Sequence, residues 1–242
     1  MASYNAAPYL GTAIASIQAQ TVRDWELIVV DDASQDQSPA LIDAYALTDN
    51  RIRPVRLPHN SGAAAARNTA IELARGRYIA FLDSDDRWRK DKLARQAEVF
   101  ETSGAPLVYS GYDRIDAAGN VFGASVSVPE AIDYRGLLNR TVIATVTAVY
   151  DRDQIGRVLM PDLAKRQDYG LWLRILRRGG VARSINEPLA SLRKRPGSLS
   201  SNKLSAIAYT WRVYRELEGF GYCRSAYHFS RYLLHATAKT LR

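Results

Sequence analysis

Residues 77–86 read Arg-Tyr-Ile-Ala-Phe-Leu-Asp-Ser-Asp-Asp, a mostly apolar run that ends in an acidic cluster. Short runs of aromatic and β-branched residues of this kind are typical of buried strands. The stretch therefore predicts a strand that ends at Leu82 and is followed directly by Asp83, Asp85 and Asp86. In an open α/β sheet, polar side chains at the carboxyl ends of the strands face the crevice in which ligands bind.

The segments on either side of this run alternate between helical and extended patterns. We expect Gly76 to cap the helix that precedes the run. A second apolar run ends in Asp31 and Asp32, which we expect at the same edge of the sheet. The alternation predicts βαβ units, and hence an α/β fold with a Rossmann-like, mostly parallel sheet flanked by helices. The predicted helices are 8–20, 38–47, 62–75 and 90–103, and the other two strands are 25–30 and 51–57.

The pattern and the charge both change along the rest of the chain. Extended segments at 107–115 and 145–150 are joined by loops, residues 168–178 have helical spacing, and the chain from residue 203 onward is helical, amphipathic and basic. Residues 1–173 carry 19 Lys and Arg against 22 Asp and Glu, whereas residues 174–242 carry 14 against 3. A part this basic indicates a phosphate-rich partner: nucleic acid, an anionic membrane surface or a diphosphate-bearing substrate.

Composition narrows the kinds of site that the chain can build. With 242 residues, 47% of them hydrophobic, it can bury a full core. One cysteine and three scattered histidines exclude a disulfide framework and a Cys/His metal site. Any metal must then be held by carboxylates. No run reaches the roughly 18 apolar residues of a membrane span, and we expect a cytoplasmic protein.

The acidic cluster suits a hard divalent cation. Carboxylates held this close together are costly unless positive charge lies between them. An alternative is that Asp85 or Asp86 caps a helix that starts near Arg87. Three acidic residues in four positions exceed what a cap requires, so we favour Mn²⁺ or Mg²⁺ as the counter-ion of the acidic cluster. The sequence does not rank Asp85 against Asp86 as its main ligand.

Several motifs in this order resemble those of family 2 glycosyltransferases, which are inverting, nucleotide-sugar-dependent enzymes with the GT-A fold. Each motif is weak alone, but their common order from residue 3 to about residue 200 is specific. The run Phe81-Leu82-Asp83-Ser84-Asp85-Asp86 is similar to the acid motif of that family. The other similar segments are Ser3-Tyr4-Asn5, Val30-Asp31-Asp32-Ala33-Ser34, Asn60-Ser61-Gly62, Ala66-Arg67-Asn68, Gln167-Asp168-Tyr169-Gly170-Leu171-Trp172 and Leu192-Arg193-Lys194-Arg195-Pro196-Gly197-Ser198-Leu199-Ser200.

The resemblance implies a site for a nucleotide-sugar donor, with a UDP-sugar as the favoured donor. It implies that Tyr4 packs near the nucleobase and that Asp32 accepts a hydrogen bond from it. The alternatives are a turn-forming role for Asp32 and a solvated helix-face charge for Arg67. The residues that the resemblance assigns to the donor are Tyr4, Asn5, Asp32, Arg67, Asn68, Asp83 and Ser84.

The resemblance also implies that Asp168 is the catalytic base. In an inverting transfer the acceptor hydroxyl loses its proton as it attacks the anomeric carbon from the face opposite the leaving diphosphate. Trp172 lies four residues later, where a helix would place its ring on the same face to support an acceptor sugar. The alternatives are a first-turn carboxylate that favours the helix dipole for Asp168 and core packing for Trp172.

Two features depart from the family pattern. The late motif has Leu192 and Arg195 where the family has tyrosine and histidine. Because guanidinium groups pair well with diphosphates, we expect Arg193 and Arg195 to contact the donor, with a basic surface loop as the alternative. The first strand, which would precede Ser3, is cut short, and we expect residues upstream of Met1.

The resulting hypothesis is a metal-dependent transfer of a sugar to a saccharide or a lipid-linked saccharide in cell-surface polysaccharide synthesis. Residues 1–106 would bind the nucleotide sugar, residues 107–202 would bind the acceptor and carry the base, and residues 203–242 would form a basic helical extension. That extension suits either peripheral contact with the inner face of an anionic membrane or ordinary packing. The competing readings are a nucleotidyltransferase, which usually needs a glycine-rich phosphate loop that residues 3–11 lack, and a nucleic-acid-binding module, for which no motif is present.

Overall fold

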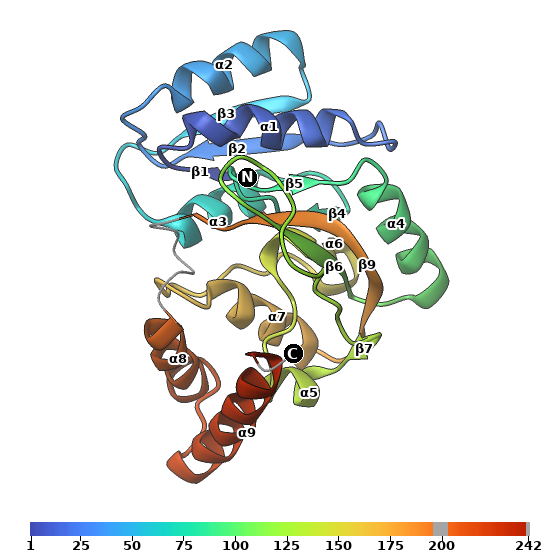
Figure 1. Cartoon of the computed structure of the whole chain (residues 1–242), viewed down its shortest axis with the longest axis vertical. Coiled ribbons are helices and arrows are strands. Elements are labelled where there is room, and N and C mark those ends of the chain that lie inside the picture. The colour runs from blue at the N-terminus through green and yellow to red at the C-terminus, as the bar shows by residue number, and fades with distance from the viewer. Residues whose placement is uncertain (196–202, 241–242) are drawn as a thin grey trace.

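A three-stranded parallel sheet forms the N-terminal part of the fold. The computed structural model describes residues 1–195 and 203–240, and its first sheet has the order β1-β2-β3, with β1 at Ala2–Ser3, β2 at Leu27–Asp31 and β3 at Ile52–Arg56. Alternate residues of β2 face opposite sides. Leu27 and Val29 pack in the core cluster under α1 (Ala7–Gln18) and α2 (Ser38–Thr48), and Ile28 and Val30 pack with Ala66 of α3 (Ala63–Leu73). The sheet is therefore covered on both faces (Figure 1).

A second, mixed sheet carries the rest of the strands. Its order is β4-β8-β6-β9-β5, and β7 pairs with β9. The long strands β6 and β9 run parallel, and the other pairs are antiparallel. The predicted α/β class is confirmed. The bounds are β4 Tyr78–Ala80, β5 Arg87–Trp88, β6 Leu107–Ile115, β7 Ala131–Ile132, β8 Val149–Asp151 and β9 Ala182–Arg193.

The strand that precedes the acidic cluster belongs to this second sheet. We expected residues 77–82 to form a strand in the parallel sheet, but β4 is shorter and its hydrogen-bonded partner is β8, which runs antiparallel. Phe81 and Leu82 remain buried beyond its end. Local hydrophobicity predicted the strand and its burial, but the choice of partner depends on a segment about 70 residues later in the chain.

The predicted helices are present, with one error at a terminus. Gly104 ends α4 in the left-handed conformation. The prediction that Gly76 caps α3 is wrong, because the helix ends at Leu73 and Ala74 is already extended. The backbone N–H of Gly76 instead donates to the Glu26 carboxylate at 3.2 Å. The remaining helices before residue 196 are α4 Lys92–Ser103, α5 Tyr134–Leu138, η1 Thr145–Thr147, α6 Arg152–Ile155 and α7 Gln167–Arg177.

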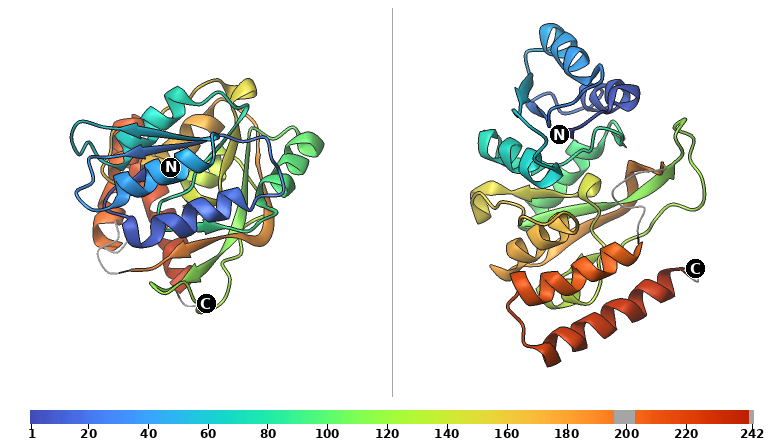
Figure 2. Two further views of the ribbon diagram at one scale, coloured as in Figure 1. Left: turned by 90° about the horizontal axis from the view of Figure 1, so that it is seen from above. Right: turned by 90° about the vertical axis from the view of Figure 1, so that its left-hand side faces the viewer.

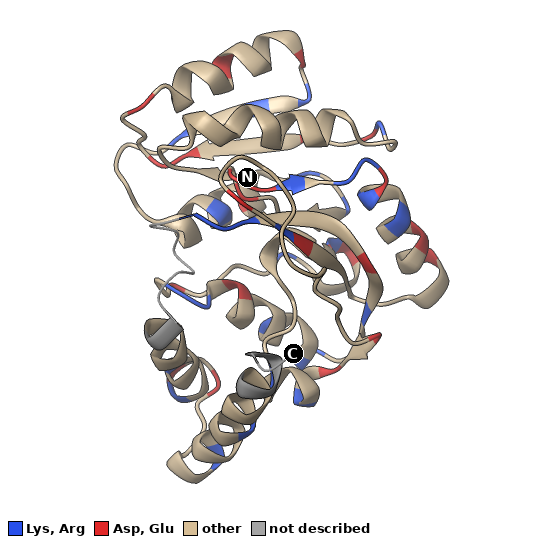
Figure 3. Ribbon diagram, viewed as in Figure 1, with Lys and Arg blue, Asp and Glu red and all other residues tan. Residues whose placement is uncertain are grey.

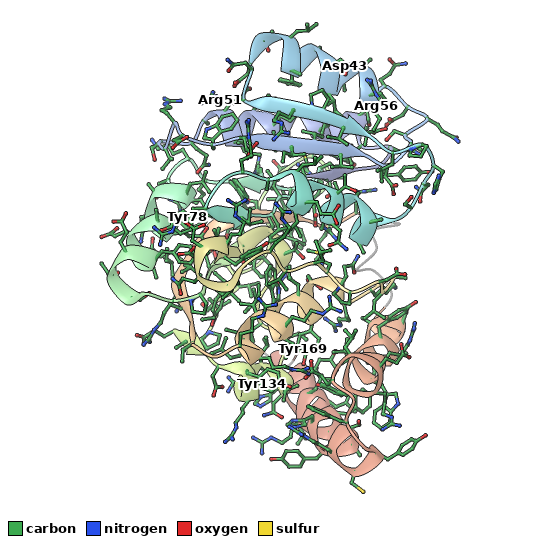
Figure 4. The ribbon with its side chains drawn as sticks, turned by 180° about the vertical axis from the view of Figure 1, so that it is seen from behind. Asp43, Arg51, Arg56, Tyr78, Tyr134 and Tyr169 are labelled. Carbon is green, nitrogen blue, oxygen red and sulfur yellow. The ribbon has the colours of Figure 1, made fainter. Side chains whose placement is uncertain are left out.

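The C-terminal helices dock against α7. They are α8 Lys203–Arg212, a π-helical turn η2 Val213–Leu217 and α9 Tyr222–Thr240, and α8 and α9 lie side by side at the end of the molecule opposite α2 (Figure 2). The Tyr169 and Tyr214 hydroxyls are 3.4 Å apart, and both donate to the carbonyl of Leu138. Figure 4 shows Tyr169 at this junction. None of the helices that the structure describes is long and apolar enough to cross a membrane.

Candidate active site

The acidic turn, residues 83–86, connects β4 to β5. Phe81 leads into it from the interior, Ser84 is buried within it, and the Asp86 N–H donates to the Asp83 carbonyl at 3.1 Å. Because β5 pairs with β9, the turn lies beside the basic end of β9. Acidic and basic segments meet there, close to the N-terminus (Figure 3).

Arg67 of α3 is the counter-ion of Asp83. Its Nη2 lies 2.5 Å from Asp83 Oδ1. Burial works against the charge of Arg67, but the carboxylates of Asp83, Asp168 and Asp86 outweigh it and raise the pKa of the guanidinium. Carboxylates from two distant parts of the chain, the acidic turn and the start of α7, therefore act on one arginine.

Asp85 and Asp86 have different surroundings. Asp86 is 4% exposed, and its Oδ1 accepts the backbone N–H of Arg193 at 2.7 Å. Burial, together with the charges of Asp83 and Asp85, raises the pKa of Asp86 well above its usual range. The Asp85 side chain is more open, and its Oδ2 lies 2.8 Å from Nε of Arg195. Asp85 is therefore the better placed of the two to meet a ligand.

Arg193 fastens the end of β9 to the acidic turn. Its Nε donates to the Asp85 carbonyl at 2.7 Å, and its Nη1 donates to the carbonyls of Asp116 and Ala117 at 2.8 and 2.9 Å. Its guanidinium carbon lies 4.8 Å from the centroid of the Tyr9 ring. These contacts give Arg193 a positioning role, and the donor contact predicted for it stays a prediction. Residues 196–200 of the same motif lie outside the described residues.

Asp32 organises the loop before α3. Its two carboxylate oxygens accept the backbone N–H groups of Ser61 at 2.7 Å and Gly62 at 2.8 Å, and the side chain is buried. Gly62 has a φ of 88°, in the left-handed region that favours glycine. A nucleobase would thus share the Asp32 carboxylate with two backbone donors.

Asp31 is a candidate that the sequence analysis did not select. Its Oδ2 accepts the N–H of Ser34 at 3.0 Å, but among the described residues its buried Oδ1 has no hydrogen-bond partner. The same holds for Oγ of Ser3, the residue opposite Asp31 in β1. An unpaired buried acceptor costs about 1–3 kcal/mol, so a ligand that donates a hydrogen bond to Asp31 Oδ1 would remove this cost. Side-chain alternation along β2, which aims Asp31 and Asp32 to opposite sides, could have indicated this.

The other residues predicted to bind the nucleotide sugar differ in how much of their surface is exposed. Tyr4 is 45% exposed at the end of β1. Asn5 has a φ of 46°, and its Oδ1 accepts the N–H of Gln35 at 2.8 Å. Asn68 exchanges two hydrogen bonds with the backbone of Met160, at 3.0 and 2.8 Å. Tyr4 is thus free to meet a nucleobase, whereas Asn5 and Asn68 hold the loops that shape the site.

Asp168 lies in the first turn of α7 at a polar cavity. Its Oδ2 accepts the Thr145 hydroxyl at 2.8 Å, and its Oδ1 accepts the Tyr169 N–H at 2.8 Å. The cavity has a volume of about 160 Å³ and is also lined by Tyr112 and Arg166. Tyr112 pairs with Ala190 of β9, and Ala190 pairs with Trp88, two residues after the acidic turn, so the sheet connects the cavity wall to that turn. The carboxylate is therefore fixed by two donors and borders a space that can admit a ligand.

Arg166 connects this cavity to the C-terminal helices. It caps α7 with a φ of 64°, which is uncommon for a residue other than glycine. Its Nη2 donates to the Tyr232 hydroxyl of α9 at 2.7 Å, and its Nε donates to the Ala206 carbonyl of α8 at 3.3 Å. The C-terminal helices thus brace the helix that carries Asp168. Sequence periodicity gave no signal for this contact.

The prediction that Trp172 supports an acceptor sugar is wrong. Trp172 is 1% exposed and packs edge-on against Phe81, with ring centroids 5.6 Å apart. Helical spacing correctly put Trp172 one turn after Asp168. Asp168, however, is at the N-terminal end of α7, whereas Trp172 is on the buried face of the helix. Core packing, the alternative reading, is the role that the structure shows.

The carboxylate oxygens of the acidic turn are suitable ligands for a hard divalent cation. Where residues are described, no three Asp, Glu, His or Cys side chains converge into a ready-made cage. Mg²⁺ and Mn²⁺ sites in phosphate-handling proteins commonly use one or two carboxylates and complete their shell with water and substrate phosphates. Asp85 presents such a carboxylate, with Asp83 two residues away. Burial is the main cause of the raised pKa of Asp86, and the negative charges of Asp83 and Asp85 raise it further; a bound cation would offset this second contribution.

Comparison with known sequences gives a consistent result. A sequence model of glycosyl transferase family 2 matches residues 1–153. Over 239 residues the chain is 40% identical to TuaG of Bacillus subtilis, named as a teichuronic acid biosynthesis glycosyltransferase, with 99% of this chain and 95% of TuaG covered. It is 36% identical over 207 residues to WfaP of Escherichia coli, a UDP-Glc:α-D-GlcNAc-diphosphoundecaprenol β-1,3-glucosyltransferase, with coverage of 86% and 80%.

Solved structures confirm the predicted GT-A fold. TarS residues 1–349 of S. aureus, crystallised with UDP-GlcNAc, superpose with a TM-score of 0.74 at 18% identity, covering 96% of this chain and 70% of TarS. The mannosyltransferase PcManGT of Pyrobaculum calidifontis, in complex with GDP-Man and Mn²⁺, gives a TM-score of 0.59 at 23% identity, covering 89% and 60%. At such identities the likeness concerns the fold alone.

Proposed function

The chain belongs to glycosyl transferase family 2, and from this we propose that it moves a sugar from a nucleotide-diphosphate sugar to an acceptor hydroxyl with inversion. The observation that carries the proposal is the 2.5 Å ion pair between Arg67 and Asp83, on a guanidinium whose pKa the charges of Asp168 and Asp86 also help to raise. It joins a donor side, at the ends of the first strands, to an acceptor side at the start of α7. The matched residues 1–153 cover the donor side.

Asp168 is the proposed base of the reaction. Its two hydrogen bonds, from the Thr145 hydroxyl and the Tyr169 N–H, hold the carboxylate at the cavity wall. An acceptor hydroxyl in that cavity would donate to Asp168 and lose its proton as it attacks the anomeric carbon. Because the carboxylate is positioned before the acceptor arrives, little reorganisation is needed at the moment of reaction.

The donor would lie across the ends of β1 and β2 and reach the acidic turn. Tyr4 is open to a nucleobase, and Asp32 would accept a hydrogen bond from its N–H group. Arg195 is the arginine that faces the diphosphate in this proposal. The favoured nucleotide is UDP, which is supported by the name of WfaP.

A divalent cation, Mn²⁺ or Mg²⁺, would be held by Asp85 and Asp83 and would stabilise the charge of the departing diphosphate. Arg67 keeps Asp83 oriented by their 2.5 Å ion pair. Asp86 acts from behind the turn, where its bond to the Arg193 N–H fixes the conformation of the turn.

The proposed acceptor is a saccharide carried by a lipid diphosphate, in the synthesis of a cell-surface polysaccharide. The names of TuaG and WfaP support this class, as does the charge of the C-terminal part, with 14 Lys and Arg against 3 Asp and Glu from residue 174 on. In the proposed division of labour, residues 1–106 bind the donor, residues 107–202 bind the acceptor, and residues 203–242 contact the inner face of the membrane.

The test is a donor screen in which the released nucleoside diphosphate is measured with Mn²⁺ and a lipid-diphosphate saccharide. We expect a UDP-sugar to be turned over by the wild type and Asp168→Asn to lower kcat by at least about 100-fold, the range for loss of a general base. Asp162→Asn, a matched change at an exposed residue of the preceding loop, should keep wild-type kcat. Full activity of Asp168→Asn would remove the base assignment, and formation of a nucleoside triphosphate from the nucleotide sugar and added pyrophosphate would point to a nucleotidyltransferase.

A further inference from the structure

The contact between Arg195 and Asp85 lies where donor and cation would meet. Arg195 follows the end of β9 by two residues, and its Nε is 2.8 Å from Asp85 Oδ2. Its guanidinium carbon lies 5.6 Å from the centroid of the Tyr9 ring, which also carries Arg193. The guanidinium thus approaches the one carboxylate of the acidic turn that is well placed to meet a ligand.

The neighbouring charges are held in other ways, which singles out this contact. Asp83 is paired with Arg67, Asp86 accepts the Arg193 N–H, and the guanidinium of Arg193 donates to carbonyls. The Arg195 and Asp85 side chains remain 32% and 17% exposed. An ion pair as open as this one is weak, about 1 kcal/mol or less, and can be exchanged for another partner.

We propose that the Arg195 guanidinium competes with the divalent cation for Asp85. When the donor diphosphate binds, Arg195 moves to the diphosphate and leaves the Asp85 carboxylate to the cation. The inference rests on the proposed function, because it takes a nucleoside diphosphate as the ligand. Because Arg195 Nε lies on Asp85 Oδ2, the guanidinium and a cation compete for that oxygen, and each positive charge weakens the attraction of the carboxylate for the other. A diphosphate offers the guanidinium paired oxygens in a bidentate geometry, which is a stronger contact.

The consequence is coupled binding. Without donor, part of the affinity of Asp85 for the cation is lost in displacing Arg195. With donor, Arg195 is drawn to the diphosphate and the carboxylate becomes available. By linkage, the donor raises the affinity for the cation by the same factor as the cation raises the affinity for the donor. The donor and the cation would thereby bind cooperatively at the acidic turn.

The experiment is isothermal titration with Mn²⁺ alone and with Mn²⁺ in the presence of saturating UDP. For Arg195→Gln we expect Mn²⁺ alone to bind about two- to fivefold more tightly than to the wild type, with a smaller gain on adding UDP. Arg87→Gln is the matched control, because Arg87 loses the same charge nearby but donates to the Gly119 carbonyl rather than to a carboxylate. Its Mn²⁺ affinity should stay close to that of the wild type.

Each result has one reading. Asp85→Asn should lose Mn²⁺ binding, and unchanged Mn²⁺ binding by this variant would overturn the proposal. Equal Mn²⁺ affinities of Arg195→Gln and wild type would overturn it as well, as would an equal rise in Arg87→Gln. If the wild type binds Mn²⁺ but none of a series of nucleoside diphosphates, the proposed function fails, whereas the Mn²⁺-alone arm still decides the competition. Circular dichroism confirms that each variant is folded.

Discussion

At the scale of single residues, the buried carboxylate of Asp32 combines structure with a predicted role in binding. Its bonds to the Ser61 and Gly62 N–H groups are charge-assisted and shielded from water. An asparagine would offer only one oxygen and would turn an N–H donor toward another donor. We expect Asp32→Asn to lower the free energy of unfolding by roughly 2 kcal/mol, which corresponds to about 4–8 °C in Tm.

Thermal unfolding measures this loss, and Asp43→Asn is its control. Asp43 forms an exposed ion pair with Arg56, the pair labelled at the edge of the first sheet in Figure 4, so its replacement should change stability by less than about 1 kcal/mol. A normal Tm for Asp32→Asn combined with a weakened affinity for UDP would show that Asp32 serves the nucleobase and not the loop.

The residues that the sequence could not assign share a physical reason. The acidic cluster was found because composition and position alone mark it. Whether Asp85 or Asp86 is open depends on Arg193, more than 100 residues away, and Asp31 was missed because an orphaned oxygen is a property of the packed interior. Trp172 was misassigned because helical spacing gives a direction around the helix but does not say what lies there.

At the scale of elements, α4 carries a lysine whose charge the fold suppresses. Lys92 is buried. Its Nζ lies 2.5 Å from Gln96 Oε1 and 4.2 Å from the centroid of the Trp88 ring. Burial lowers the pKa of Lys92 to about 7. In the unfolded chain the group has its ordinary pKa near 10.4, so the unfolded state binds more protons between these values. The contribution of Lys92 to stability should therefore rise with pH from about 7 to 10 and stay level below pH 7, where both states carry the proton.

Replacement by methionine separates this effect from general changes with pH. Methionine has similar volume and no charge, so Lys92→Met should remove the Lys92 contribution to the pH dependence. At pH 7 we expect a gain of roughly 2 kcal/mol in the free energy of unfolding, after the loss of the Gln96 bond. Urea unfolding at pH 7 and pH 10 measures both. Lys90→Met, an exposed neighbour, should leave the pH dependence as it is, and a wild-type slope in Lys92→Met would contradict the assignment.

The elements themselves were the most predictable part of the fold. The strand at residues 107–115 was predicted with the bounds of β6, because Pro106 precedes it and the turn-forming Gly119 and Asn120 follow it. The end of α3 was misplaced because a glycine can end a helix but is not obliged to, and here Glu26 collects the free N–H groups beyond Leu73. The pairing of β4 with β8 depends on contacts between distant segments, for which local pattern has no information.

At the scale of the whole molecule, α9 has one face packed and one face open. Tyr232 is buried and bound to Arg166, whereas Arg224, Tyr227, Arg231 and Leu234 are exposed at helical spacing. Basic and amphipathic side chains on one face suit the surface of an anionic membrane, where each arginine contributes about 1 kcal/mol. Replacing Arg224 and Arg231 together by glutamine should weaken binding to phosphatidylglycerol vesicles by about 10- to 30-fold, measured by co-sedimentation.

The control replaces two exposed arginines outside the C-terminal helices, Arg23 and Arg56, and should retain binding. Point changes are preferable to deleting the C-terminal helices, because Tyr214 is fully buried in the main core cluster and its removal would expose that core. Equal vesicle binding by both double variants would leave α9 with its packing role alone.

The arrangement of the second sheet has a consequence for synthesis on the ribosome. The partners of β4 and β5 are residues 149–151 and 190–191, so the first 106 residues leave the exit tunnel with two strands that have no neighbours. Translation must proceed past residue 193 before the acidic turn gains its anchoring arginine. The second sheet of the nascent chain therefore stays incomplete during most of its synthesis. Pausing or truncation before residue 193 should yield a chain with unpaired strand edges that binds chaperones.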